Sequence, residues 1–380
     1  MRNKVPVMQN YVYFDYNEAM ESPYGDISLT GCLDCGFVYN RLFNQEKLRY
    51  DSGYDNCVPS NIFLNYYKDI ANYLYSQYDI KDGLVIDIGC GKGEFIRLLC
   101  SIYPDVAAIG IDPTCRPNIE FGGRLQLIKS EFSPGLVTKR PALVISRHVV
   151  EHISSPALFL NTIRKGISRY PETPVFIEVP DLNWIVENDA YWDICYEHCN
   201  YFTNTSICNA LQISGFDRAV VQNAFGGQYL WAESRLCSDK IEESIDMESN
   251  LLYRISSYET REKQVIALMK GKLEEFHRDG YSVVVWGMAT KGVVFCNLID
   301  PNNTLINYCI DVNPGKHNAF VPLTGHKIQA PDDLCGMNIN NLIVIVMNMN
   351  YLNEIKECCA KLWVYQKAIF MGADGIRVNT

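Results

Sequence analysis

The sequence predicts an α/β fold with a doubly wound, largely parallel sheet, followed by a second and smaller α/β unit. Three observations support this fold class. Strand-like apolar segments alternate with helical segments between residues 80 and 235. A tight turn rich in glycine joins one of these strands to the next helix, at residues 89–93. A strand that meets glycine and then a helix occurs again from residue 281 onward, after a polar stretch.

The length and composition indicate a globular protein with more than one domain. The 380 residues are enough for two or three domains, and 48% of them are hydrophobic and 21% charged. The formal net charge of −10 argues against a nucleic acid held by a basic surface. A small anionic substrate could still be held by a few local lysines and arginines.

The sequence also carries information on cellular location. No apolar run reaches the ~18 residues of a membrane span, and the first residues lack the apolar core of a signal peptide. The 15 cysteines mostly lie singly in apolar segments, which is typical of reduced thiols. We therefore expect a cytoplasmic protein without a nucleic-acid or membrane partner. The sequence leaves its oligomeric state open.

Changes in composition divide the chain into four segments. They are an irregular, tyrosine-rich N-terminal segment with a Cys-x-x-Cys knuckle (1–70), the large sheet unit (71–236), a polar segment of linking helices (237–278) and the smaller α/β unit (279–380). Helical periodicity in the linking segment occurs at 247–253 and 265–269. In the large unit we expect helices at 60–78 and 94–100 and strands at 84–88, 107–111, 125–128, 142–146, 175–179 and 229–233. In the smaller unit we expect strands at 281–286, 305–310 and 342–347 and a helix at 291–299.

The run from Leu84 to Glu94 is the most informative segment of the chain. Its glycines follow the spacing G-x-G-x-G, which differs from the dinucleotide spacing G-x-G-x-x-G. Asp112 ends the next strand about twenty residues later, where an acid can accept hydrogen bonds from ribose hydroxyls. This order of strand, glycine turn, helix, strand and acid resembles the S-adenosylmethionine site of class I methyltransferases; a glycine turn in another kind of α/β domain would leave the acid unexplained. The donor-binding residues that we expect are Asp87, Gly89, Gly91, Gly93, Asp112, Glu131 and His148.

Two histidines follow a later strand of the same unit. The segment from Ser146 to Ile153 places His148 and His152 four residues apart, with Glu151 between them. If a helix begins here, both histidines share one face of it. The H-x-x-E-H spacing superficially resembles an inverted zinc-protease motif, so a metal site with two histidines is an alternative. A histidine that satisfies backbone groups at a helix start is another.

A second polar cluster occurs at residues 196–201. Tyr196, Glu197, His198, Asn200 and Tyr201 place five hydrogen-bonding side chains among large aromatic residues. Because a buried polar group needs a partner, such density is unusual in a core. A histidine flanked by a carboxylate and phenols is suited to act as a general base. The alternative is an aromatic-rich surface loop.

Polar residues also follow the strands of the smaller unit. A strand that meets glycine and a helix start offers amide groups to a phosphate, and Lys291 adds positive charge. Taken alone this signal is weak, because many α/β loops contain glycine and lysine. The residues concerned are Gly287, Thr290, Lys291, Asp311, Asn313, Lys316 and His326.

Together these motifs resemble one family, the nucleotide-sugar C-methyltransferases of deoxysugar biosynthesis, which include C-3 methyltransferases acting on 4-keto-6-deoxy sugars. The resemblance runs from about Val5 to Gly372 and includes Cys32-x-x-Cys35, the glycine turn, the segment 148–152, Tyr196-Glu197-His198, residues 225–229 and the smaller α/β unit. It implies a class I methyltransferase sheet that binds S-adenosylmethionine and a C-terminal Rossmann-like domain that binds the nucleotide sugar. It also implies an N-terminal zinc-knuckle domain.

The resemblance carries residue roles with it. His198 matches the base that removes a proton beside the sugar ketone, with Glu197 as its neighbour. His152 matches a second active-site histidine, and it, Tyr196 and Asn200 are candidates for holding the keto oxygen. Either Tyr50 or Tyr54 supplies an N-terminal phenol. The C-terminal residues from Gly287 to His326 named above are expected to bind the nucleotide sugar.

The chain departs from the family at its zinc knuckle. Members usually carry two Cys-x-x-Cys pairs, whereas this chain has only Cys32 and Cys35. Two thiolates make a poor structural zinc site, so we favour its absence unless Cys57 or a histidine contributes. Two other functions remain open at this point. One is O- or N-methylation of a different small molecule, and the other is a non-catalytic binding protein with a vestigial donor site.

Overall fold

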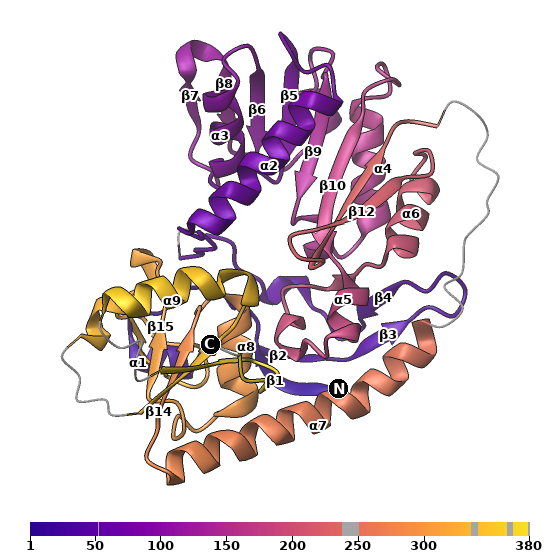
Figure 1. Cartoon of the computed structure of the whole chain (residues 1–380). Coiled ribbons are helices and arrows are strands. Elements are labelled where there is room, and N and C mark those ends of the chain that lie inside the picture. The colour runs from indigo at the N-terminus through magenta and orange to yellow at the C-terminus, as the bar shows by residue number, and fades with distance from the viewer. Residues whose placement is uncertain (52, 238–250, 336–340, 363–367, 379–380) are drawn as a thin grey trace.

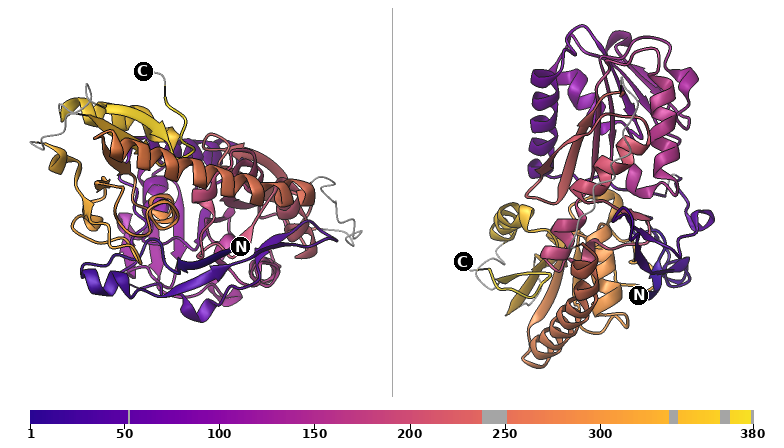
Figure 2. Two further views of the ribbon diagram at one scale, coloured as in Figure 1. Left: turned by 90° about the horizontal axis from the view of Figure 1, so that it is seen from below. Right: turned by 90° about the vertical axis from the view of Figure 1, so that its right-hand side faces the viewer.

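The computed structural model describes residues 1–51, 53–237, 251–335, 341–362 and 368–378. The chain forms two α/β lobes, which lie one above the other in Figure 1. The large lobe is built on an eight-stranded sheet and the small lobe on a five-stranded sheet. The N-terminal strands lie against the small lobe, alongside the long helix at the bottom of the view (Figures 1 and 2).

The sheet of the large lobe has the strand order β12-β13-β10-β9-β5-β6-β8-β7. Strands β10, β9, β5, β6 and β8 are parallel, and β13, β12 and β7 add antiparallel pairs at the edges. The strands are β5 (Leu84–Ile88), β6 (Ala107–Ile111), β7 (Asn118–Glu120), β8 (Leu125–Ile128), β9 (Leu143–Arg147), β10 (Val175–Pro180), β12 (Val220–Ala224) and β13 (Tyr229–Ser234). The six strands predicted for this unit are confirmed, each within one residue.

Helices cover both faces of this sheet, which confirms the doubly wound fold. Helices α2 (Asn61–Gln77) and α3 (Glu94–Ile102) share one core with the sheet. Helices α4 (Pro156–Gly166) and α6 (Asn204–Ile213) share another core with its opposite face. Because both faces are covered, the central strands are almost continuously apolar and every residue of β9 is buried.

The order of the strands places a topological switch point between β5 and β9. From β5 the chain moves outward to β6 and β8, then returns to β9 and continues outward to β10. In open α/β sheets, ligands bind beyond the carboxyl ends of the strands at such a point. The two loops that flank it are residues 89–93, after β5, and residues 148–153, after β9.

The sheet of the small lobe is parallel and has the order β16-β15-β14-β17-β18. Its strands are β14 (Ser282–Trp286), β15 (Tyr308–Ile310), β16 (Ile328–Gln329), β17 (Leu342–Val346) and β18 (Ala368–Gly372). Helices α7 (Leu251–Arg278) and α8 (Thr290–Ile299) pack against one face, and α9 (Leu352–Lys361) packs against the other. The switch point of this sheet lies between β14 and β17.

The linking segment, predicted as one or two helices, contains the 28-residue helix α7; residues 238–250, which include part of the predicted periodic segment, lie outside the described residues. Two other predicted elements differ from the structure. Residues 305–307 do not extend β15, because the amides of Leu305 and Ile306 donate to the Asp300 carboxylate. His148 does not begin a helix: its φ is +55°, and only Val150–His152 form a short 3₁₀ turn, η4. His148 and His152 therefore do not share a helix face.

The N-terminal segment is more regular than expected. Strands β1 (Arg2–Pro6) and β2 (Tyr24–Ile27) pair with each other, the short helix α1 (Tyr16–Met20) lies between them, and β3 (Leu29–Gly31) and β4 (Val38–Asn40) pair with β11 (Asn200–Tyr201). The buried Arg2 guanidinium donates to the carbonyls of Tyr191 and Ile194 and pairs with Glu262 of α7 at 2.8 Å. The segment thus shares a core with the small lobe. None of the helices in the described ranges combines the length and apolar character of a membrane span.

Candidate active site

The glycine loop after β5 is braced by an acid from the end of β6. The amide of Gly91 donates to Oδ2 of Asp112 at 2.9 Å, while Oδ1 accepts from the amide and hydroxyl of Thr114 at 2.7 and 2.6 Å. Gly91 has φ +56°, and no atom lies within 4 Å of the position that a Cβ would take there. This open, left-handed backbone beside a carboxylate fits the ribose and methionine parts of S-adenosylmethionine.

The same loop touches the histidine-bearing loop after β9. A Cβ at Gly89 would collide with the side chain of Val149, so the two loops pack directly against each other. Gly93, the last glycine of the turn, has φ +84° at the start of α3. Asp87 is buried behind the loop, and burial raises the pKa of its carboxyl to about 7. Glu131 lies exposed beyond the end of β8.

His148 is held between two buried carboxylates. Its amide donates to the Glu178 carbonyl at 2.8 Å, and its ring stands edge-on to Tyr229. Its Nδ1 lies 3.4 Å from Oε1 of Glu151 and its Nε2 lies 3.5 Å from Oε2 of Glu178. The predicted donor-binding histidine therefore sits at the switch point, beside the glycine loop.

A buried ion pair lies below this histidine, and the sequence motifs did not predict it. Nε of Arg147 donates to Oε2 of Glu178 at 2.6 Å, and the guanidinium covers the rings of Tyr67 and Phe95. Oε1 of Glu178 accepts hydrogen bonds from Tyr66 and Trp231. An arginine and a glutamate within apolar strands were the available signal, because buried charges need partners.

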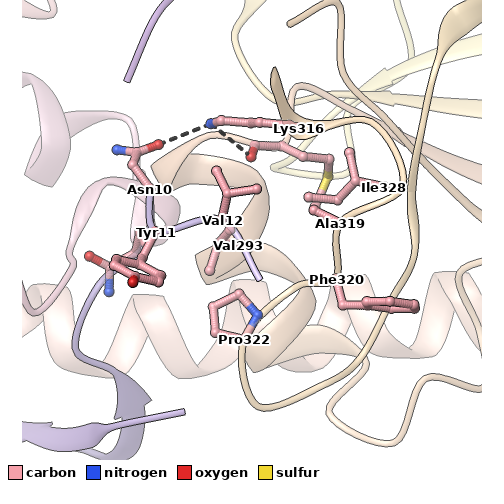
Figure 3. Close-up of a pocket in the computed structure, with 11 residues that line it drawn as sticks. Asn10, Tyr11, Val12, Val293, Lys316, Ala319, Phe320, Pro322 and Ile328 are labelled. Carbon is pink, nitrogen blue, oxygen red and sulfur yellow. Dashed lines mark hydrogen bonds between the residues drawn. The ribbon is translucent and has the colours of Figure 1, made fainter. Parts of the chain in front are cut away.

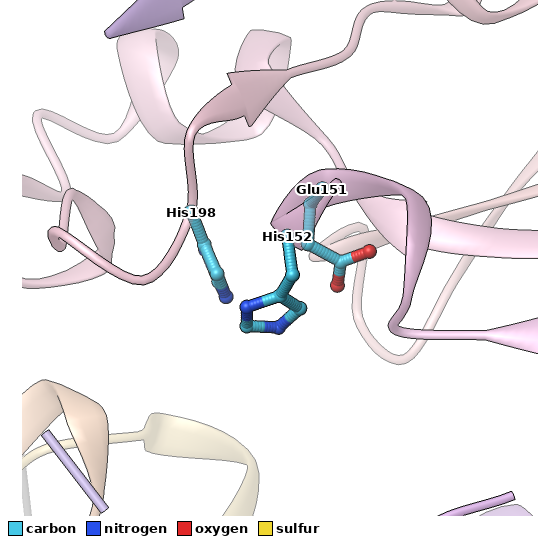
Figure 4. Close-up of side chains that lie close together, drawn as sticks. All are labelled: Glu151, His152 and His198. Carbon is cyan, nitrogen blue, oxygen red and sulfur yellow. The ribbon is translucent and has the colours of Figure 1, made fainter. Parts of the chain in front are cut away.

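His152 and His198 form a pair at the same edge of the sheet (Figure 4). Their ring centroids lie 4.8 Å apart and the rings are nearly perpendicular. Nδ1 of His152 lies 3.0 Å from the Glu197 carbonyl, so geometry assigns a proton to this nitrogen, because a carbonyl only accepts. The Tyr50 hydroxyl lies 3.2 Å from the same nitrogen. Burial lowers the pKa of His198 to about 3, and His152 adds to this effect, so the His198 ring is neutral.

Glu197 is engaged with the N-terminal segment. Its Oε1 accepts from the amides of Gln9 and Asn10 at 2.6 and 3.3 Å, and its Oε2 accepts from Tyr54 at 2.9 Å. Burial raises the pKa of Glu197, while His152 and these donors oppose the rise. The two candidate phenols thus have different partners: Tyr50 contacts His152 and Tyr54 contacts Glu197.

Tyr196 and Asn200 are not placed to hold a keto oxygen. The Tyr196 hydroxyl accepts from the Asn44 amide at 2.9 Å, and its ring is fully buried against Phe43 and Gly25. The side-chain amide of Asn200 donates to the carbonyls of Val150 and Ile153 at 3.1 and 2.6 Å. The structure gives no support to direct catalytic contact by either residue, because their polar atoms hold loops together.

Possible metal ligands occur at two places. Glu151, His152 and His198 each offer one atom, and these atoms lie within 4.8 Å of one another (Figure 4). Ligand atoms around a tetrahedral zinc lie about 3.4 Å apart for bonds of about 2.1 Å, so this cluster is wider than a zinc site. In the part of the chain that the structure describes, no third ligand joins Cys32 and Cys35. The four-thiolate knuckle of the family is therefore not formed by the described residues.

Lys291 joins the carboxyl edges of the two sheets. Its Nζ donates to both carboxylate oxygens of Asp193 at 2.5 and 2.6 Å and to Gln228 at 3.1 Å. The side chains of Gln228 and Asn348 exchange two amide hydrogen bonds of 3.0 and 3.1 Å. Gln228 lies in the turn between β12 and β13, beside the carboxyl end of β10 in the large lobe, and Asn348 follows β17 in the small lobe, so the carboxyl edges of the two sheets meet here.

The N-terminal segment fills part of the small-lobe edge (Figure 3). The Lys316 ammonium is buried and donates to Oδ1 of Asn10 at 3.1 Å and to the Met288 carbonyl at 3.3 Å. The Asn10 amide donates in turn to the Thr290 hydroxyl at 2.9 Å. A cavity of about 10 Å³, room for about one water molecule, remains beside these residues. Asn10 was not predicted, because its partners lie far away in sequence.

Asp311 and Asn313 organise the loops of this edge, near Gly287 at the end of β14. Asp311 accepts from the amides of Met288 and Asn313 at 2.7 and 2.8 Å. The Asn313 side chain donates to Asp55 at 3.2 Å, and the same carboxylate lies 3.6 Å from Nζ of Lys92 in the glycine loop. Asp55 therefore connects the donor loop to the small lobe.

His326 lies away from this edge. It is buried, and its Nε2 lies 3.1 Å from Oδ2 of Asp300, which ends α8. Lys291 lies at the other end of this ten-residue helix, about 15 Å away by helix rise. The structure gives no support to substrate binding by His326, because its ring nitrogens contact Asp300 and Thr324.

Comparison with known proteins gives two family matches and one curated relative. Residues 62–222 match a methyltransferase domain, and residues 230–367 match a C-methyltransferase C-terminal domain. The C-methyltransferase NovU of Streptomyces niveus is 22% identical over 313 residues, which cover 77% of this chain and 73% of that protein.

Solved structures match a part of the chain. A putative O-methyltransferase of Nostoc punctiforme is 13% identical, with a TM-score of 0.35 over 46% of this chain and 56% of that chain. Human N-acetylserotonin methyltransferase in complex with S-adenosylmethionine is 14% identical, with a TM-score of 0.33 over 44% and 52%. The matched part spans about half the length of these solved chains. With its glycine loop and both matched domains, the chain is an S-adenosylmethionine-dependent methyltransferase that combines a methyltransferase domain with a C-methyltransferase C-terminal domain.

Proposed function

We propose that this enzyme methylates carbon C-3 of a nucleotide-linked 4-keto-6-deoxy sugar, as a step in deoxysugar biosynthesis. One observation carries the proposal: the carboxyl edge of the large sheet, where neutral His198 lies against His152 of the loop after β9, meets the carboxyl edge of a second α/β sheet. A binding site for S-adenosylmethionine alone needs only one such sheet, so we assign the second sheet to the other substrate. The likeness to a protein named as a C-methyltransferase supports transfer to carbon.

The proposal divides the two ligands between the lobes. Residues 71–236 bind S-adenosylmethionine through the loop of Gly91 and through Asp112. Residues 279–380 bind the nucleotide sugar, whose diphosphate is an anion that Lys291 and the start of α8 are suited to hold. Thr290, Asp311, Asn313 and Lys316 shape the loops around it. Residues 1–70 close the site from the side through Tyr50 and Tyr54.

The reaction needs a base, because a carbon beside a ketone is nucleophilic only after it loses its proton. Nε2 or Nδ1 of neutral His198 takes that proton, and the C–H electron pair becomes an enolate across the carbon and the keto oxygen. The Tyr50 hydroxyl, which lies 3.2 Å from Nδ1 of His152, is the group that donates a hydrogen bond to the enolate oxygen. S-adenosylmethionine, when bound, supplies the electrophilic methyl group that the carbon accepts as the C–S bond breaks.

The decisive experiment follows deuterium at the carbon next to the ketone. The enzyme is incubated in water with nucleotide 4-keto-6-deoxy sugars deuterated at C-3, with and without S-adenosylmethionine labelled in its methyl group. We expect loss of the deuterium and a labelled methyl group on C-3. Transfer of the label to an oxygen or nitrogen with the deuterium retained would establish the rival O- or N-methylation. Sugars without the nucleotide serve as the control for the role of the small lobe.

A further inference from the structure

The Glu151 carboxylate is buried without the partners that such a group requires. Its exposed fraction is 1%, and neither oxygen has a hydrogen-bond partner among the residues that the structure describes. The nearest nitrogen, Nδ1 of His148, lies at 3.4 Å, which is too long for a well-formed hydrogen bond. A buried carboxylate in this condition is costly to the folded state, so its presence calls for an explanation.

The carboxylate is held next to the histidine pair. One of its oxygens lies within 4.8 Å of ring nitrogens of both His152 and His198 (Figure 4). The main chain around it is fixed to the segment that carries His198. The Cys199 thiol lies 3.4 Å from the Glu151 carbonyl, and the Asn200 amide donates to the carbonyls on both sides, at Val150 and Ile153. The spacing between Glu151 and His198 is therefore set by the fold.

The other charged groups nearby are already paired. Arg147 forms its ion pair with Glu178 at 2.6 Å, and Glu178 also lies against Nε2 of His148. Tyr50 faces the cluster from the N-terminal segment and Cys199 from the segment before β11. Both are neutral at ordinary pH, because desolvation and, to a smaller extent, the nearby carboxylates raise their pKa. Three imidazoles, those of His148, His152 and His198, are thus the groups that can become cations beside Glu151.

We propose that Glu151 is the counter-charge of the base: its carboxylate stabilises the imidazolium that forms when His198 takes a proton from the substrate carbon. This inference rests on the proposed function and assigns a residue to it. In that step the C–H bond breaks, an N–H bond forms on His198, and the electron pair remains in the enolate. Glu151 itself touches no reacting atom and is a positioning residue.

The electrostatics of the site agree with this role. Burial makes a cation on His198 unfavourable and lowers its pKa, while the Glu151 charge acts in the opposite direction. Burial alone raises the pKa of Glu151, but the neighbouring histidines hold it below its usual range, so the carboxylate is ionised. A fixed negative charge of this kind needs no reorganisation when the proton moves.

The test compares Glu151→Gln and Glu151→Asp with the wild-type enzyme. In Glu151→Gln we expect deuterium wash-out to slow by a hundredfold or more, as for loss of an effective base, and the acid limb of kcat/KM to move to lower pH. The affinity for S-adenosylmethionine, measured by calorimetry, stays within twofold. The Tm at pH 7.5 stays equal or rises, because an unpartnered buried charge has been removed. Glu151→Asp, which keeps the charge, retains part of the wash-out rate.

Several results would overturn this role. A wash-out rate within twofold of wild type would show that Glu151 has no function in proton removal. A fall in both the Tm and the affinity for S-adenosylmethionine would show that its role is purely structural. An equimolar divalent ion that Glu151→Gln loses would make the residue a ligand instead. If the wild-type enzyme itself exchanges no deuterium with any nucleotide 4-keto sugar, the proposed function fails and not merely the role of Glu151.

Discussion

The amide of Gly91 donates a 2.9 Å hydrogen bond to the carboxylate of Asp112, across 21 residues of sequence. This contact joins the end of β6 to the glycine loop after β5, so the acid that we propose to bind the ribose also shapes the loop. We therefore predict that Asp112→Ala weakens S-adenosylmethionine binding by at least tenfold, as measured by calorimetry. The exposed Asp279→Ala should leave the dissociation constant unchanged. Equal affinities for both variants would remove Asp112 from the donor site.

His198 is predicted to separate donor binding from chemistry. In His198→Asn the ring that takes the proton is lost, so wash-out and methyl transfer should fall by a hundredfold or more. Donor affinity should stay near that of wild type, because the glycine loop is untouched. The control is His277→Asn, which changes an exposed side chain of α7 and should leave the enzyme fully active. A His198→Asn enzyme with near-normal kcat would mean that another group is the base.

Asp87 should give the folded state a measurable dependence on pH. Burial raises the pKa of Asp87 from 3.8 to about 7, so the folded state holds a proton that the unfolded state releases between these values. The stabilisation that this proton brings is complete below pH 3.8 and is lost as the pH rises through 7. At about 1.4 kcal/mol per pH unit, wild type should lose stability relative to Asp87→Asn by about 2–3 kcal/mol between pH 5 and pH 7.

Thermal unfolding across this pH range checks the prediction. The Tm of Asp87→Asn minus that of wild type should increase with pH by several degrees. As a control, Asp69→Asn changes an exposed side chain of α2, and its Tm should differ from that of wild type by the same amount at every pH. Parallel curves for Asp87→Asn and wild type would show that the carboxyl is already ionised at pH 5.

The sequence predicted the parts of the fold that depend on local patterns. Strands such as β5 and β6 are buried on both faces and read as short apolar runs, and the glycines of residues 89–93 mark a turn that other residues cannot make. The β15 strand was predicted too long, because the partner of Leu305 and Ile306 is the side chain of Asp300 and not a strand.

The site was predictable only where a motif and its surroundings coincide. A dense polar segment such as 196–201 shows that hydrogen bonds are needed but not which side chain points where. His198 faces His152, whereas the neighbouring Tyr196 points to Asn44. The pair of Asn10 and Lys316 joins residues at opposite ends of the chain, and no spacing in one sequence reveals such a contact.

Lys291 is predicted to hold the anionic part of the substrate. In the structure its ammonium is neutralised by Asp193, with 18% and 19% of the two side chains exposed, so an incoming diphosphate must compete with this carboxylate. Lys291→Met should raise the KM for the nucleotide sugar by at least tenfold with little change in kcat, because the contact is present before and during the reaction. Asp193→Asn should lower that KM or leave it unchanged.

His326→Ala, at the other end of α8, is the matched contrast: it removes a buried partner of Asp300 and should lower the Tm by a few degrees while KM stays the same. If Lys291→Met keeps the wild-type KM, the diphosphate lies elsewhere on the small lobe; steady-state kinetics with the sugar varied at saturating S-adenosylmethionine decides between the two.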